Sequence, residues 1–133
     1  MKTFSFTQEI IFNATPDQLY DLLMDEKKHA AFTGADAKIS NRKGGKFSAY
    51  DNYITGKNLE LIKGKKIAQE WHASEMPENY FSLITFEFIL QSKNKTLLKF
   101  SHEKIPLGLN ADYEKGWIDF YWDPMKKYLA AGY

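Results

Sequence analysis

Apolar and polar residues alternate along the first segment of the chain, residues 3–12. Alternation of this kind places every second side chain on the same face of an extended strand, so it predicts a β-strand with one buried face. The polar face carries Ser5, Thr7 and Glu9, and Gln8 is the one polar residue on the apolar side. The apolar face is made of Phe4, Phe6, Ile10 and Phe12.

A helix start follows in the stretch TPDQLYDLL. Thr15 is expected to be the N-cap, Pro16 suits the first helical position, and Gln18 stands where the second partner of a capping box belongs. Leucines then recur at helical spacing. A second short helix is expected around Lys27 to Phe32, and it would end at Gly34.

Residues 35–103 are predicted to form successive antiparallel strands, separated by turns rich in Gly, Asn and Asp. The clearest pattern is YFSLITFEFILQ, where every second residue from Ile84 to Leu90 is apolar. In KKIAQEWH, Ile67, Gln69 and Trp71 share one face of the predicted strand.

The stretch GWIDFYWDPMKKYL near the C-terminus has more aromatic residues than a surface helix needs. At about 100° per residue its apolar side chains span an arc of roughly 200°, about twice the usual stripe. The arc runs from Tyr113 and Phe120 on one side to Ile118 and Trp122 on the other. Pro124 removes the N–H that would bond to the carbonyl of Phe120, so a kink is expected there. A kinked helix with so broad an apolar face suits the concave side of a curved sheet.

The order of elements is therefore a strand, two short helices, about six further strands and a long helix. This order predicts an α+β fold, in which an antiparallel sheet of about six or seven strands wraps around the kinked C-terminal helix. The sequence has no repeat and no linker-like stretch, so residues 1–133 are expected to form a single domain.

Composition narrows the class of protein. An aromatic content of 16% and a hydrophobic content of 44% indicate a packed core. The absence of cysteine excludes disulfides and thiol catalysis, and it favours a reducing, cytoplasmic compartment. The first residues lack the continuous apolar core of a signal peptide, and no run approaches the roughly 20 apolar residues of a membrane helix. We therefore expect a cytoplasmic protein that does not bind a membrane.

The formal charge of +1 gives no general attraction to nucleic acid, and no nucleic-acid partner is expected. The charge is unevenly distributed, however. From Lys38 to Lys66 the chain has eight basic residues and two acidic ones, a net charge of +6. One interpretation is a solvated set of strand edges, where lysines discourage pairing between sheets. The alternative is a docking face for an acidic partner, centred on Lys63, Lys65 and Lys66.

Several stretches together resemble a known family. HAAFTGADAKIS, GGKFSAYDNYITGKNLELIKGKKIAQEW, YFSLITFEF, KIP and GWIDFYWDPMKKYL occur in the order found in the C-terminal domain of the activator of heat-shock protein 90 ATPase and its stand-alone bacterial homologues. This family belongs to the START-related polyketide-cyclase (SRPBCC) superfamily. The resemblance covers nearly the whole chain. It implies a helix-grip fold with an apolar cavity under the long helix, and a domain that helps to engage the chaperone.

The broad apolar face of the final helix predicts a ligand pocket beneath it. Gln69 and His102 share strand faces with apolar residues and would orient a ligand, and Glu114 falls inside the apolar arc as a polar anchor at the pocket mouth. The alternatives are a satisfied buried amide, a core histidine and a first-turn carboxylate near the positive helix end. If His102 and Glu114 met in a dry pocket, they would form an acid–base pair. The aromatic wall would be Trp71, Phe86, Phe88, Phe100, Trp117 and Tyr121.

The remaining motifs carry little chemistry. His29 and His72 are expected at the surface or at a strand edge. The histidines show no metal-ligand spacing, so neither a metal nor a cofactor is expected. Gly44-Gly45 lacks the pattern of a phosphate-binding loop and predicts a hairpin turn.

Three functions follow from this sequence. The first is a binding module that takes a small hydrophobic molecule under the final helix. The second is a co-chaperone-like module that binds a heat-shock protein 90 homologue. The third is a cavity enzyme of the cyclase or hydrolase type, which the absence of a committed nucleophile or metal set disfavours. A monomer or a weak dimer is expected.

Overall fold

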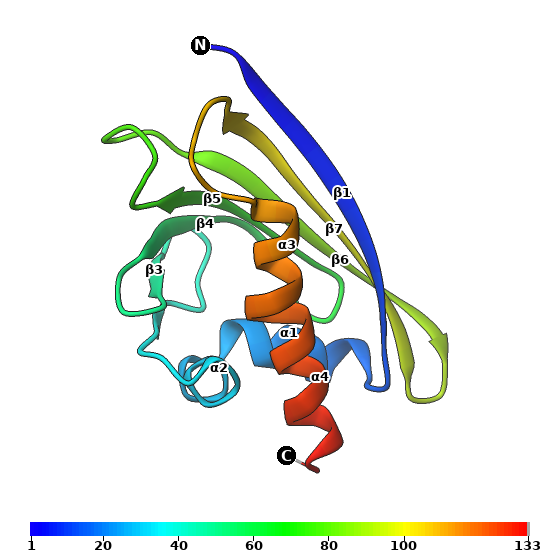
Figure 1. Cartoon of the computed structure of the whole chain (residues 1–133). Coiled ribbons are helices and arrows are strands. Elements are labelled where there is room, and N and C mark those ends of the chain that lie inside the picture. Colours follow the sequence, from blue (N-terminus) through cyan, green and yellow to red (C-terminus); the bar gives the residue numbers. More distant parts are fainter. Residues whose placement is uncertain (133) are drawn as a thin grey trace.

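The computed structural model describes residues 1–132 and contains one seven-stranded sheet with helices on one side of it (Figure 1). The strands are β1 (Thr3–Phe12), β2 (Lys38–Ile39), β3 (Lys46–Ala49), β4 (Ile54–Ile62), β5 (Lys66–Ala73), β6 (Ser82–Ser92) and β7 (Lys95–Pro106). The helices are α1 (Pro16–Met24), α2 (Glu26–Thr33), α3 (Tyr113–Trp117) and α4 (Asp123–Ala130). A π-helical turn (Ile118–Trp122) joins α3 to α4, and the three form one continuous C-terminal helix. Among residues 1–132, no helix has the length and apolar character that crossing a bilayer requires.

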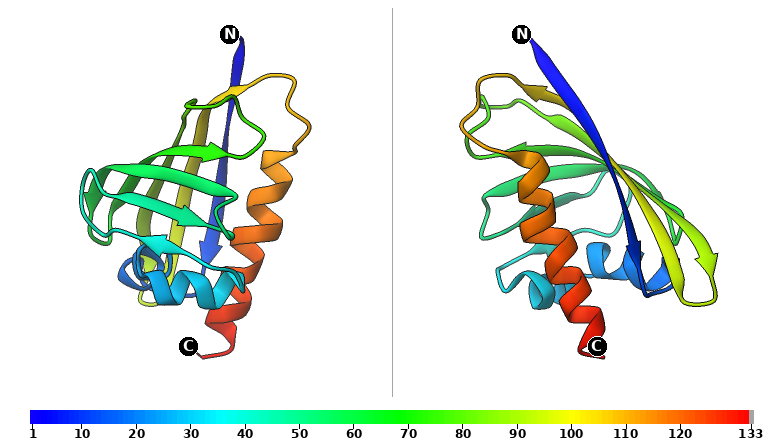
Figure 2. Two further views of the ribbon diagram at one scale, coloured as in Figure 1. Left: turned by 90° about the vertical axis from the view of Figure 1, so that its left-hand side faces the viewer. Right: turned by 45° about the vertical axis from the view of Figure 1, so that its right-hand side comes forward.

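All neighbouring strands pair antiparallel, in the order β1-β7-β6-β5-β4-β3-β2. The register shifts where β1 pairs with β7, where β4 pairs with β5 and where β6 pairs with β7. Such bulges bend a strand and increase its twist. The sheet is curved, and the C-terminal helix crosses its inner face (Figures 1 and 2). The predicted α+β helix-grip fold is confirmed.

The two short helices form where the sequence predicts them. The side chain of Thr15 accepts from the N–H of Gln18 at 3.2 Å, and the Gln18 side chain accepts from the N–H of Thr15 at 2.8 Å. These two bonds complete the capping box, so α1 starts at Pro16. Gly34, in a left-handed conformation with φ 72°, ends α2. Helix α2 lies against α4, at the end of the sheet where α1 packs on β6.

The C-terminal helix widens into the π-helical turn just before Pro124. The N–H of Asp123 bonds to the carbonyl of Ile118, five residues back rather than four. Pro124 has no N–H to offer the carbonyl of Phe120, and the hydroxyl of Tyr50 donates to that carbonyl instead. The irregularity predicted at Pro124 therefore takes the form of a wide turn, and a side chain from the turn between β3 and β4 satisfies the carbonyl that Pro124 leaves without a donor.

The wide turn also decides which helix residues face the sheet. In an α-helix, residues five apart diverge by about 140°. Here Trp117 and Trp122 stack, with ring centroids 5.5 Å apart and an interplanar angle of 23°, and both are buried. Phe120 and Ile118, in contrast, are 58% and 43% exposed. The predicted arc of roughly 200° is therefore wrong at Phe120 and Ile118, because the wide turn brings both tryptophans inward and leaves these two residues outside.

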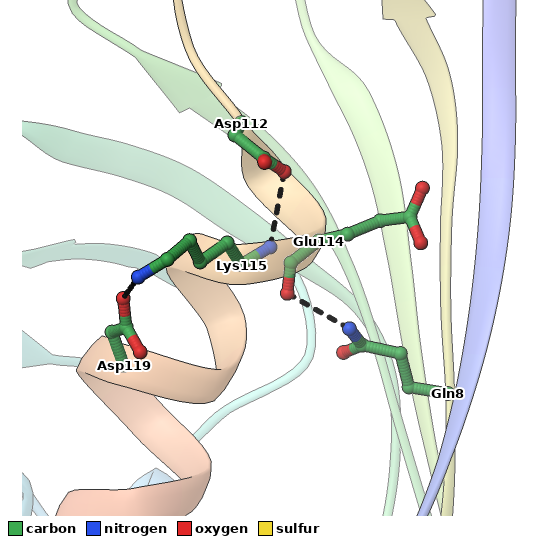
Figure 3. A network of polar contacts seen from close by, with 5 residues as sticks. All are labelled: Gln8, Asp112, Glu114, Lys115 and Asp119. Carbon is green, nitrogen blue, oxygen red and sulfur yellow. Dashed lines mark hydrogen bonds and ion pairs between the residues drawn. The ribbon is translucent and has the colours of Figure 1, made fainter.

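The core lies between the helix and the middle of the sheet. Phe100 packs against both tryptophans of the helix, with ring centroids 4.4 Å from Trp117 and 5.1 Å from Trp122. A hydrogen bond explains why the polar Gln8 lies on the apolar side of β1. Its side-chain oxygen accepts from the Trp122 indole N–H at 2.8 Å. The Gln8 amide nitrogen also donates to the carbonyl of Glu114 at 2.9 Å (Figure 3). The side-chain amide of Gln8 thus connects the first strand to both halves of the C-terminal helix.

Candidate functional site

An open cleft of about 430 Å³ lies between the first half of the C-terminal helix and the turn that joins β3 to β4. Seven of its eleven lining residues are aromatic. Gly116 leaves the helix side of the cleft open, because, apart from its chain neighbours and the backbone of its own helix, no atom of the described residues lies within 4 Å of the place a Cβ would take there. The aromatic residues are Tyr50, Tyr53, Trp71, Tyr113, Trp117, Phe120 and Tyr121.

A second, enclosed space lies directly beneath the helix and holds only about 20 Å³. A volume of this size accommodates roughly one water molecule. Gln69 and Phe86 line this small space, whereas Trp71, Trp117 and Tyr121 line both the small space and the open cleft. Side chains therefore fill most of the room expected under the helix, and the larger space opens at its flank.

The other expected ligand residues lie elsewhere. Phe88, Phe100 and His102 are buried in the core and line neither space. Glu114 is exposed at the start of the helix, and its side chain extends away from the helix (Figure 3). The predicted pocket-mouth position of Glu114 is therefore wrong. At 100° per residue Glu114 falls inside the predicted apolar arc. In the structure, however, the side of the helix that carries Glu114 lies next to Gln8 and is exposed to solvent.

His102 is a satisfied core histidine. Its side chain is fully buried, with Nε2 at 2.9 Å from the Ser82 hydroxyl and Nδ1 accepting from the Trp117 indole N–H at 3.1 Å. Burial lowers the pKa of His102 to about 3, so the ring is neutral. Both nitrogens are occupied by core partners, and Glu114 is not one of them, which removes the basis for the acid–base pair.

Gln69 is likewise engaged with the protein. Its amide nitrogen donates to the side-chain oxygen of Asn58 at 2.9 Å. The Asn58 amide in turn donates to the carbonyls of Ser40 and Arg42, at 2.7 and 2.9 Å. This buried chain of bonds fixes the turn between β2 and β3 to the sheet.

His29 is buried, and its predicted surface position is wrong. The side chain is 4% exposed, and its Nε2 lies 3.1 Å from the hydroxyl of Tyr121 on the C-terminal helix. Burial lowers the pKa of His29 to about 4. The spacing of three between His29 and Phe32 was the available signal, because residues three apart share a helix face.

Sequence reasoning also missed a carboxylate behind the cleft. Glu75, in the loop after β5, accepts from the hydroxyl of Tyr53 at 2.7 Å and from the hydroxyl of Tyr113. Burial, and then the hydrogen bond and charge of Glu75, raise the pKa of both tyrosines, so both hydroxyls remain protonated donors. The three residues come from three separate segments, and no local spacing relates them.

The three lysines proposed for partner docking lie at the hairpin between β4 and β5. Lys63 and Lys65 are exposed, and Lys66 forms an ion pair with Glu60 at 2.8 Å. Within residues 1–132, no group of three or more His, Asp or Glu side chains gathers in a way that could hold a metal ion.

Comparison with known proteins identifies relatives along nearly the whole chain. Residues 13–130 match the family described as Activator of Hsp90 ATPase homolog 1-like protein. The chain is 30% identical over 130 residues to the Activator of 90 kDa heat shock protein ATPase homolog 1 of Mus musculus, covering 98% of this chain and 38% of that protein. The corresponding homologue of Dictyostelium discoideum is 33% identical over 116 residues, covering 87% of this chain and 30% of that protein. The chain thus spans less than two fifths of the length of these relatives.

One solved structure matches this fold over nearly the whole length of both chains. An HSP90 activator from Plasmodium falciparum superposes with a TM-score of 0.88 at 27% identity, covering 95% of this chain and 96% of that one. The resemblance noted in the sequence motifs is confirmed by these matches. The protein belongs to the activator of Hsp90 ATPase homolog 1-like family and has its helix-grip fold.

Proposed function

We propose that this protein is a binding module, not an enzyme, and that it takes a small hydrophobic molecule in the open cleft beside the C-terminal helix. The observation that carries the proposal is the cleft itself, with its volume of about 430 Å³ and its mostly aromatic wall. Ligand sites commonly have volumes of about 300–1,000 Å³ and predominantly apolar linings. Of the residues predicted for the site, Trp71, Trp117 and Tyr121 are proposed as the contacts.

The exposed ring of Phe120 supports the same proposal. It is 58% exposed and stands at the edge of the cleft, 5.7 Å from the ring of Tyr50. A ligand in the cleft would cover this ring, and burying its apolar area would favour binding.

Ligand binding is expected to raise the thermal stability of the protein and to depend on Gly116. A neutral aromatic probe such as 2-naphthol, at ten times its Kd, should stabilise the folded state by about 1.4 kcal/mol. Gly116→Leu should abolish this effect, because the new side chain enters the open cleft. The same change should leave the free protein at least as stable, since leucine favours a helix over glycine by about 1 kcal/mol. Thermal unfolding with and without the probe measures both effects.

Gly116→Ala is the matched control, because a methyl group leaves most of the cleft open. It should keep the stabilisation by the probe. Equal stabilisation of the wild type and Gly116→Leu would place the probe elsewhere and would reject the cleft as the site.

A second function is favoured by the comparisons. The relatives from mouse and Dictyostelium are named as activators of the 90 kDa heat shock protein ATPase, and the Plasmodium structure is described as an HSP90 activator. We propose that this domain also engages a heat-shock protein 90 homologue. The basic hairpin around Lys63 and Lys65 is the proposed contact, because opposite charge on a partner would accelerate association.

Reversing the two exposed hairpin lysines is expected to slow association with the chaperone. Lys63→Glu with Lys65→Glu should lower the association rate about tenfold and weaken its salt dependence, because the steering charge is lost. Surface plasmon resonance with the heat-shock protein 90 homologue of the same host measures both. The control is Lys93→Glu with Lys95→Glu, which makes the same change at the exposed hairpin between β6 and β7. Equal slowing by both pairs would reject a specific contact at the first hairpin.

A further inference from the structure

The lining of the open cleft contains one acidic residue and no lysine or arginine. Asp112 is the only acidic or basic residue in its lining, and Glu75 stands directly behind the lining residues Tyr53 and Tyr113. Two ion pairs occur among residues 1–132, Lys66 with Glu60 and Lys115 with Asp119. Neither involves Asp112 or Glu75.

We propose that the cleft selects an organic cation, an ammonium group that bears apolar substituents, over neutral and anionic molecules of the same shape. The inference rests on the proposed binding function of the cleft and names the class of ligand. Aromatic faces carry negative electrostatic potential and attract ammonium groups within about 6 Å. The cleft has aromatic rings on both sides, from the helix and from the turn between β3 and β4.

The hydrogen bonds to Glu75 strengthen this preference. Tyr53 and Tyr113 both donate to the same carboxylate, which draws their protons toward Glu75 and leaves more electron density on the phenol rings. A cation against these rings gains from the ring and from the carboxylate behind it. An anion at the same place is repelled by that carboxylate.

Two positive charges on the first half of the C-terminal helix already have acidic partners. The ammonium of Lys115 lies 2.6 Å from Asp119 on the outer side of the helix (Figure 3). The positive end of the C-terminal helix is capped by Asp112, whose carboxylate accepts from the N–H of Lys115 at 3.1 Å (Figure 3). A cation in the cleft therefore meets the Asp112 carboxylate and aromatic rings, with no lysine or arginine in the wall.

Two probes of equal shape test the proposal. Benzyltrimethylammonium and neopentylbenzene differ in one central atom, nitrogen with its positive charge or neutral carbon. The cation is expected to bind about tenfold more tightly, a preference in the range of a partly desolvated cation–π site. Titrations followed by NMR shifts of the indole N–H of Trp71 and Trp117 give both affinities and locate the probe. Phenylacetate, the anionic probe, should bind more weakly than either.

The preference should depend on Glu75. Glu75→Gln is expected to reduce the ratio of the two affinities to about threefold or less, while the affinity for neopentylbenzene stays unchanged. Glu78→Gln is the matched control, since it removes the same charge from an exposed position in the same loop, and it should keep the ratio. If Glu75→Gln fails to fold, the double variant Tyr53→Phe with Tyr113→Phe tests the same point, because it retains both rings and removes both hydrogen bonds.

The outcomes separate the two proposals. Equal affinity for cation and isostere, or a preference for phenylacetate, overturns the selection of cations and leaves hydrophobic binding intact. A ratio unchanged by Glu75→Gln and by the double tyrosine variant overturns the role of the carboxylate. Binding of none of the probes to the cleft rejects this inference and the proposed hydrophobic site together.

Discussion

Acidification from pH 7 to pH 5 is expected to lower the free energy of unfolding by about 3–4 kcal/mol through two histidines alone. The histidines are His29, with its pKa lowered by burial to about 4, and His102, with its pKa lowered by burial to about 3. In the unfolded chain both rings have an ordinary pKa of about 6.5.

The direction follows from which state binds protons. Between about pH 7 and pH 5 the unfolded chain takes up a proton on each ring, while the folded protein keeps both rings neutral. Protonation therefore favours unfolding. The stabilisation by each neutral ring is fully present above pH 6.5, and it decreases as the pH falls toward the folded pKa values.

Urea unfolding at several pH values measures this effect. Substituting one histidine at a time separates the contributions of the two rings to the pH dependence. His29→Gln should remove about half of the slope, because glutamine can still bond to Tyr121 but does not titrate in this range. A free energy of unfolding that stays constant from pH 7 to pH 5 would contradict the neutral, buried state of the two rings.

Trp122→Ala is expected to destabilise the protein by about 3–5 kcal/mol, the range for removing a large buried aromatic. Trp122 is 2% exposed, its ring packs against Phe100, and its indole N–H is the donor to Gln8. The change leaves a cavity and an unpaired acceptor on Gln8, and both lower stability. Because small domains have only about 5–15 kcal/mol of stability in total, this loss would leave the folded state marginal.

Phe120→Ala is the internal control, two residues earlier in the same helix. Its ring is 58% exposed, so the change should reduce stability by less than about 1 kcal/mol. Urea unfolding of both variants at pH 7 makes the comparison. Similar losses at the two positions would contradict the inward orientation that the π-helical turn gives to Trp122.

The strands and the first helix could be predicted from sequence because their signals are local. Alternation over residues 3–12 and the capping box at Thr15 each depend on neighbours a few positions away, and both predictions are confirmed. Gln8 illustrates the limit of such signals. The sequence marks it as a polar residue on an apolar face, but its partners, Trp122 and the carbonyl of Glu114, belong to the other end of the chain.

The final helix was predicted in outline, but its orientation was not. A fixed angle of about 100° per residue assumes a regular α-helix. The π-helical turn breaks that assumption just before Pro124, so Trp122 turned inward and Phe120 turned outward. The sequence could indicate a disturbance at Pro124. The geometry of the turn depends also on the hydroxyl of Tyr50, and the residue pattern of the helix gives no information about a partner from another segment.

The site was predicted least well, because tertiary packing determines it. Trp71, Trp117 and Tyr121 were named from their places on strand and helix faces, and all three line the open cleft. The turn that supplies Tyr50 and the loop that supplies Glu75 have no periodic pattern, so nothing in the sequence related them to the helix. The turn supplies the far wall of the cleft, and the loop places the Glu75 carboxylate behind that wall.

The pairing of the first strand with the last has a consequence for synthesis of the protein. Within residues 1–132, the only strand that pairs with β1 is β7, which lies far from it in the sequence. While the ribosome extends the polypeptide, β1 emerges early and remains unpaired until β7 has been synthesised. Pairing between such distant segments slows folding, because a long loop must close first. The sheet therefore cannot be completed until β7 has been synthesised, and a nascent chain arrested before β7 would keep an unpaired, aggregation-prone strand.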